Sequence, residues 1–198
     1  MRKYTITKQD SKIGWDTVPA APIDNYLWEG KVPICAQAQL CYDDKALYIR
    51  LCAQEAQIRA EETGPLGCPC DDSCLEFFFS PIPGDSRYFN IECNPNGCVF
   101  LGFGSNRYNL VRLQPLDMPV QPKIEKTADG WSCEYQIPYD FIRMFFPSFS
   151  PASGSNIYAN FYKCGDKTPQ PHFIAWNPIE LKTHDFHRPD FFGELVFE

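Results

Sequence analysis

Residues 72–103, with the sequence DSCLEFFFSPIPGDSRYFNIECNPNGCVFLGF, are predicted to form three consecutive β-strands. Polar and apolar side chains alternate along residues 74–80 and 87–93, as they do when a strand has one buried face. Asn, Pro and Gly at residues 94–97 favour a tight turn, and residues 98–103 return as the third strand. We expect the apolar faces to form the core; they carry Leu75, Phe77, Phe79, Phe89, Ile91 and Cys93.

The opposite face of these strands is the candidate binding surface. It carries Glu76, Phe78, Tyr88, Asn90 and Glu92. Carboxylates and amides bind hydroxyl groups, and aromatic rings pack against the C–H faces of sugars. The face is therefore suited to a neutral polyhydroxylated ligand. The alternative is a solvated sheet face whose polar residues have no ligand.

The rest of the chain predicts more short strands and almost no helix. Strand patterns cover residues 4–7, 34–42, 46–53, 107–113, 123–127, 131–137, 157–164 and 194–197, and residues 138–146 predict one short helix. This pattern indicates an all-β fold, an antiparallel β-sandwich in a single domain over residues 1–198. Three tryptophans are predicted to pack against the sandwich: Trp15, Trp28 and Trp176.

Charge and hydropathy exclude several partners. The formal net charge is −7, and no Lys/Arg cluster is present, which argues against nucleic acid and against anionic membrane surfaces. No apolar run is long enough for a membrane span. The N-terminal residues contain no apolar segment of a signal peptide, so we expect a cytoplasmic protein, or an extracellular one if a leader has been removed. The sequence leaves the oligomeric state open.

The ten cysteines are predicted to be reduced packing residues, because half of them lie within strand patterns. Cys68, Cys70 and Cys74 form the one cluster dense enough to consider for zinc. We expect no cofactor and no metal, with structural calcium left open through Asp71 and Asp72.

Six motifs in order resemble the family-nine carbohydrate-binding modules and their uncharacterised relatives. These motifs are DDSCLEFFF (71–79), YFNIECNPNG (88–97), DGWSCEYQIP (129–138), NFYKC (160–164), AWNP (175–178) and FHRPDFFGELVF (186–197). The resemblance covers about residues 34–198. It implies a jelly-roll-like β-sandwich that binds a mono- or oligosaccharide without catalysis, often within proteins that degrade glycans.

The resemblance also implies site residues. The family's strand Glu matches Glu76, its next polar strand position matches Asn90, and its last polar strand matches Asn160 and Tyr162. Well-described members hold the sugar between two Trp rings. In this chain one ring position falls on Phe186 and the other on Cys70, so the double Trp clamp is absent.

The residues themselves add further candidates. Tyr88 and Glu92 share the polar face, and His187, beside Phe186, is predicted to lie at its mouth, with a hydrogen-bonded surface histidine as the alternative. Glu76 and Glu92 also fit a glycoside hydrolase, whose two carboxyl groups lie about 5–5.5 Å apart in retaining enzymes. A third reading is a haem-binding sandwich with Met118 or Met144 as an iron ligand.

Overall fold

The structure is a computed structural model that describes residues 1–10 and 13–198. In this part of the chain the strands are β1 (Lys3–Lys8), β2 (Ala21–Ile23), β3 (Asn25–Leu27), β4 (Cys35–Tyr42), β5 (Ala46–Gln54), β6 (Cys74–Ser80), β7 (Tyr88–Cys93), β8 (Val99–Gly104), β9 (Leu110–Arg112), β10 (Lys123–Lys126), β11 (Gly130–Pro138), β12 (Asn156–Cys164), β13 (Phe173–Ala175) and β14 (Gly193–Phe197). The helical segments are α1 (Tyr139–Phe145) and the short 3₁₀ turns η1 (Trp15–Thr17), η2 (Pro69–Asp71) and η3 (Pro189–Phe191).

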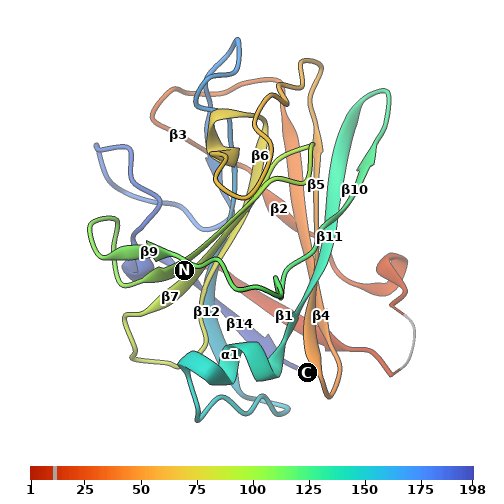
Figure 1. Cartoon of the computed structure of the whole chain (residues 1–198), viewed down its shortest axis with the longest axis vertical. Coiled ribbons are helices and arrows are strands. Elements are labelled where there is room, and N and C mark those ends of the chain that lie inside the picture. The colour runs from red at the N-terminus through yellow and green to blue at the C-terminus, as the bar shows by residue number, and fades with distance from the viewer. Residues whose placement is uncertain (11–12) are drawn as a thin grey trace.

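The strands form one curled sheet whose two halves face each other (Figure 1). Its main path runs β10-β11-β5-β4-β1-β14-β12-β6-β7-β8-β9. The prediction of a mostly β protein is confirmed. The prediction of a purely antiparallel sheet is wrong, because β1 pairs in parallel with both β14 and β4. The sequence of residues 4–7 predicted a strand but did not indicate with which other strands it would pair. The jelly-roll-like arrangement stays a prediction.

The core lies between the two halves of the sheet. The apolar faces of β6 and β7 meet those of β4, β5 and β11 in one cluster of buried side chains. Phe77 stacks between Phe79 and Phe161 with ring centroids 4.9 and 5.2 Å away. Trp176 also belongs to this core, which confirms its predicted packing role. Alternation therefore predicted the inner faces correctly.

Most predicted elements occur within one or two residues of their expected bounds. The helix predicted at 138–146 is α1, and the strand predicted at 107–113 is only the three residues of β9. The short strands β2, β3 and β13 were not predicted. Within residues 1–10 and 13–198, no helix has the length and apolar character needed to cross a membrane.

A buried polar network joins the two halves at one end of the core. Lys163 on β12 points inward, and its Nζ lies 3.3 Å from Glu55 Oε2, 2.8 Å from His172 Nε2 and 2.9 Å from the Cys164 carbonyl oxygen. Glu55 follows β5 and also accepts hydrogen bonds from Trp131 Nε1 at 2.7 Å and Ser73 Oγ at 2.9 Å. All three ammonium protons thus have partners, as a buried charge requires.

The outer face of β6, β7 and β12 is covered by residues 176–192, here named the C-terminal arm. Asn160 donates to the Asn177 carbonyl oxygen at 2.9 Å and accepts from the Asn177 amide at 2.8 Å. The arm can return into β14 so closely because residue 193 is glycine: a Cβ there would lie 2.7 Å from Cη2 of Trp176. The face that the sequence indicated as a binding surface is therefore mostly buried.

The buried network predicts how stability depends on pH. Burial, and then the charge of Lys163, lower the pKa of His172 from 6.5 to about 4. Between these values the unfolded chain binds a proton at His172 that the folded protein excludes, so stability falls as the pH drops from about 6.5 to about 4. We expect the free energy of unfolding of His172→Gln to fall by about 2–3 kcal/mol less than that of the wild type over this pH range. The glutamine keeps an acceptor for Lys163.

Chemical denaturation of both proteins at a series of pH values measures the difference. His184→Gln is the matched control, because it makes the same replacement at an exposed histidine outside the buried network. Identical pH slopes for wild type and His172→Gln would contradict the role of His172.

Candidate functional site

One small pocket remains open where the C-terminal arm meets the outer sheet face. Its cavity measures about 230 Å³. We name it the arm pocket; its lining residues are Trp28, Cys70, Glu76, Glu92, Arg107, Cys164, Asp166, Phe173, His184, Asp185, Phe186 and His187. Four of the eight predicted site residues are therefore in its wall: Glu76, Glu92, Phe186 and His187.

Two carboxyl groups form the floor of the arm pocket. Glu76 on β6 and Glu92 on β7 are direct partners across the two strands, and both are buried. Burial and then the neighbouring Glu92 raise the pKa of Glu76 well above its ordinary value. Burial likewise raises the pKa of Glu92 to about 7. The hydrogen bond that Asn90 Nδ2 donates to Glu92 at 3.0 Å acts in the opposite direction and lowers this pKa. Near neutral pH the pair therefore holds less than two full negative charges.

The rim of the pocket carries further charges. Arg107, from the turn between β8 and β9, places its Nε 3.1 Å from Asp185 Oδ1. Asp166 follows β12, and burial and then Asp71 raise its pKa. The rim thus presents both donors and acceptors to a ligand above the floor.

Aromatic rings form one side of the arm pocket. Phe186 lies flat on Tyr162, with ring centroids 4.1 Å apart and an interplanar angle of 10°. Trp28 lies 5.6 Å from Phe186 and stacks on His184 at 4.7 Å. Trp28 has a positive φ of 49°, and its Nε1 donates to the Leu181 carbonyl oxygen at 2.8 Å. The ring that the sequence assigned to packing therefore also faces the pocket.

The other four predicted residues lie beneath the pocket, fully buried. Tyr88 Oη is 2.9 Å from His187 Nδ1, and Tyr162 Oη donates to the Phe186 carbonyl oxygen at 3.2 Å. Asn160 binds the arm, and Asn90 binds Glu92 while its own Oδ1 has no partner among the described residues. These side chains hold the wall in place, and their contact with a ligand stays a prediction.

His187 is held as a neutral imidazole. Burial and then Arg107 lower its pKa to about 4, so it carries no charge near neutral pH. With Tyr88 on Nδ1, its ring fixes the arm over Phe78, whose centroid lies 5.2 Å away. His187 is half-buried and lines the pocket, so it does not fit the alternative of a hydrogen-bonded surface histidine.

Several wall residues were missed by the sequence reasoning. Arg107, Asp166, His184 and Asp185 lie in turns whose paths alternation does not predict. Cys70, onto which the resemblance places the second clamp ring, was not predicted as a site residue and also lies in the wall. Asp185 had a local signal, because its carboxylate accepts from the His187 amide at 3.1 Å in an Asx-type turn.

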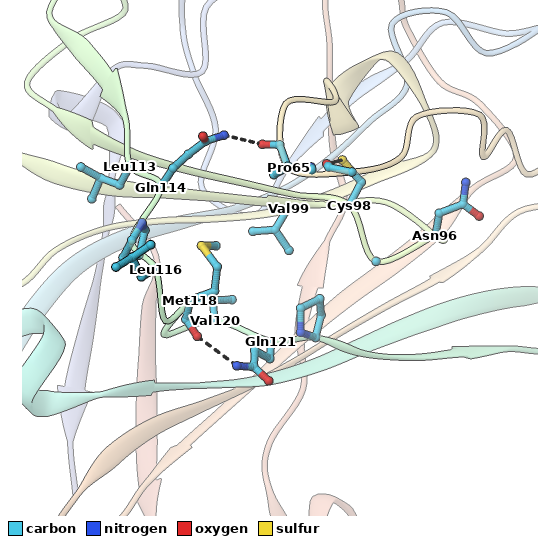
Figure 2. Close-up of a pocket in the computed structure, with 14 residues that line it drawn as sticks. Pro65, Asn96, Cys98, Val99, Leu113, Gln114, Leu116, Met118, Val120 and Gln121 are labelled. Carbon is cyan, nitrogen blue, oxygen red and sulfur yellow. Dashed lines mark hydrogen bonds between the residues drawn. The ribbon is translucent and has the colours of Figure 1, made fainter.

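A larger cavity of about 620 Å³ lies elsewhere, between the start of β8 and the Pro-rich link to β10 (Figure 2). Aliphatic side chains such as Val99, Leu113, Leu116 and Met118 surround it. Its side-chain hydrogen bonds go to backbone carbonyl oxygens, as from Gln114 Nε2 to Pro65 at 2.7 Å and from Cys98 Sγ to Gly64 at 3.2 Å. With no carboxylate in its lining, this cavity matches sugar hydroxyls poorly.

The residues considered for metals have other surroundings. Asp72 is buried and accepts hydrogen bonds from Asn94 Nδ2 and from the Glu61 and Glu62 amides at 2.8–2.9 Å, besides pairing with Arg59. Asp71 pairs with Lys167 at 2.6 Å. Structural calcium stays a prediction. All ten cysteines are unpaired, and Cys68 is exposed.

Comparisons with known proteins show which structures and which family this chain is similar to. A crystal structure of a candidate carbohydrate-binding protein from Bacteroides uniformis ATCC 8492 is similar over 100% of this chain and 99% of that one, with 26% identity and a TM-score of 0.84. No curated protein matches this sequence.

Two structures of a family 9 carbohydrate-binding module from Caldicellulosiruptor kristjanssonii, in complex with cellotriose and with glucose, are 16% and 15% identical. Both have a TM-score of 0.68 and cover 100% of this chain, which covers 94% and 96% of theirs. They share the fold. The profile described as carbohydrate-binding family 9 matches residues 7–197. Because this match spans nearly the whole chain, the protein belongs to carbohydrate-binding family 9.

Proposed function

We propose that this protein is a non-catalytic carbohydrate-binding domain that holds one sugar unit of a mono- or oligosaccharide in the arm pocket. The observation that carries the proposal is the arrangement of acceptors, donors and rings around one small cavity. Glu92 and Asp166 offer acceptors and Arg107 offers donors, while Trp28 and Phe186 offer ring surface. Sugars need both kinds of contact on the same unit.

The size of the pocket supports a small ligand. Its cavity of about 230 Å³ is below the range of pockets that hold drug-sized molecules, about 300–1,000 Å³. One sugar ring, with any further units outside the rim, fits this limit. The relatives seen with cellotriose and glucose support a hexose as the first ligand to test.

The family favours binding over the glycoside hydrolase alternative. Glu76 and Glu92 are direct cross-strand partners, but the family 9 relatives in complex with sugars are described as binding modules. We further propose, on the family resemblance alone, that the domain serves glycan degradation. We also propose that the protein works in a reducing compartment such as the cytoplasm, and the ten unpaired thiols support this location.

The first test removes one carboxylate from the pocket floor. We expect Glu92→Gln to weaken binding of glucose or cellotriose about ten- to hundredfold, because a hydrogen bond to a charged group contributes about 1.5–3 kcal/mol. Isothermal titration calorimetry at pH 8, above the Glu92 pKa of about 7, measures the change while the wild-type group is ionised.

Glu125→Gln is the control, because Glu125 lies exposed on β10, away from the arm pocket. Equal affinities for wild type and Glu92→Gln would place the sugar elsewhere. No binding of any sugar by the wild-type protein would end the proposed function.

The second test separates the two roles of Phe186. Its ring is buried against Tyr162 and also lines the pocket. We expect Phe186→Ala to lower the free energy of unfolding by about 3–5 kcal/mol, as for other buried Phe side chains. Denaturant unfolding measures this loss, and Phe191→Ala, a half-buried ring under Arg188, should cost clearly less. Unchanged stability with weaker sugar binding would show that Phe186 acts only as a ligand platform.

A further inference from the structure

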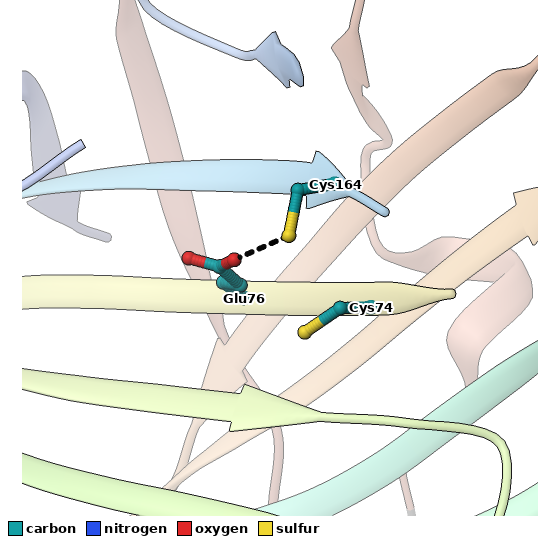
Figure 3. Close-up of side chains that lie close together, drawn as sticks. All are labelled: Cys74, Glu76 and Cys164. Carbon is teal, nitrogen blue, oxygen red and sulfur yellow. Dashed lines mark hydrogen bonds between the residues drawn. The ribbon is translucent and has the colours of Figure 1, made fainter. Parts of the chain in front are cut away.

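Three soft or acidic side chains converge at the base of the arm pocket (Figure 3). Cys74 and Glu76 are two residues apart on β6 and share its outer face, and Cys164 on β12 is the direct cross-strand partner of Cys74. One ligand atom from each residue lies within 4.8 Å of the others, and all three side chains are buried. In Figure 3 the thiol of Cys164 points to the carboxyl group of Glu76, and the thiol of Cys74 lies beside them.

The three groups have few other partners. Glu76 Oε1 lies 2.9 Å from Cys164 Sγ, and among the described residues Glu76 forms no ion pair. A thiol is a weak hydrogen-bond donor, so it compensates a buried carboxyl group poorly. A cation bound at the base of the pocket would therefore give the Glu76 carboxylate a directly bound positive charge, beyond the more distant charge of Lys163.

The cluster can also be reached from outside. Glu76 and Cys164 both line the arm pocket, and Cys70 lines it beside them. Cys164 Sγ is 4.0 Å from the Cys70 carbonyl oxygen, so η2 lies directly over the cluster. An ion can enter through the pocket, and one coordination position would face the cavity.

We propose that Cys74, Cys164 and Glu76 bind one thiophilic divalent ion of the Zn²⁺ class. Zinc takes thiolate sulfur at about 2.3 Å and carboxylate oxygen at about 2.0–2.2 Å, so two sulfur ligands of one ion lie within about 4.6 Å of each other. The ligand atoms of the three side chains all lie within 4.8 Å of one another, which is comparable with this limit. The hard cations Ca²⁺ and Mg²⁺ prefer oxygen ligands alone and do not suit two sulfurs.

Binding involves no redox step, and three anionic ligands around a divalent ion leave the site with a net charge of −1. Each thiol releases its proton to solvent and binds as thiolate, and Glu76, where it is protonated, likewise releases its proton and binds as carboxylate. These three negative charges face the two positive charges of the ion, and the fourth position is open to water or to Cys70. This site differs from the Cys68, Cys70 and Cys74 cluster that the sequence suggested, and the proposal departs from the expectation of no metal, which stays untested.

The test is metal binding by the full chain. Protein stripped with a chelator under reducing conditions is titrated with Zn²⁺ in competition with a chromophoric chelator, and with Cd²⁺ to record thiolate-to-metal charge-transfer absorption. We expect one ion per chain and a charge-transfer band. Cys74→Ala and Cys164→Ala should each weaken Zn²⁺ binding at least about tenfold, the lower end of what even outer partners of metal ligands contribute.

Two control variants and one further ligand variant identify the metal ligands. Cys35→Ser and Cys68→Ser remove exposed thiols outside the cluster and should bind like the wild type. Glu76→Gln keeps its shape, so it tests the site even if a cysteine variant fails to fold, and circular dichroism reports folding in each case. Weaker binding in Glu76→Gln with normal folding supports the site.

Three results would overturn the proposal: less than one ion per chain, no charge-transfer band, or affinity that follows Cys35 or Cys68 instead of Cys74 and Cys164. The proposal does not depend on sugar binding. Sugar titrations of the metal-free protein test the proposed function by itself, so the failure of either one is recognised separately.

Discussion

The structure depends on covering both faces of β6, because every residue of this strand is buried. The facing half of the sheet covers the inner side, and the C-terminal arm covers the outer side. Buried polar groups need hydrogen-bond partners, and the arm supplies them: the Phe186 carbonyl oxygen for Tyr162 and residue Asn177 for Asn160. The arm pocket is the part of the outer face that this cover leaves open.

Acidic groups gather at that opening, and their position explains what the pocket can bind. Glu76 and Glu92 face each other where water is scarce, so their ionised forms are disfavoured unless something donates hydrogen bonds or brings positive charge. Sugar hydroxyls do the first and a metal ion does the second. The two ligands would use different atoms, because the thiols of Cys74 and Cys164 suit a soft ion and offer little to a hydroxyl group.

Local alternation was enough to predict the inner sheet faces and the pairing of Glu76 with Glu92, because both follow from two strands joined by a short loop. It could not predict the cover over the outer face, since the arm has almost no periodicity. Nor could it bring Cys164 to Cys74, which requires the register of two strands far apart in sequence. Trp28 packs against the outer cluster of buried side chains, as predicted, but its further place in the pocket wall was not predicted.

The parallel strand β1 has a consequence for how the protein reaches this fold. It lies between β14 and β4, so it joins the two halves of the sheet, and its partner β14 is the last strand of the sequence. During synthesis the halves can form their own hairpins, but the seam between them waits for residues 193–197 to leave the ribosome. Pairing across nearly the whole chain carries a high entropic cost of closure, which slows folding. Until then β12 and β1 each have one unpaired edge, where β14 will pair, and these edges are exposed to pairing with other chains.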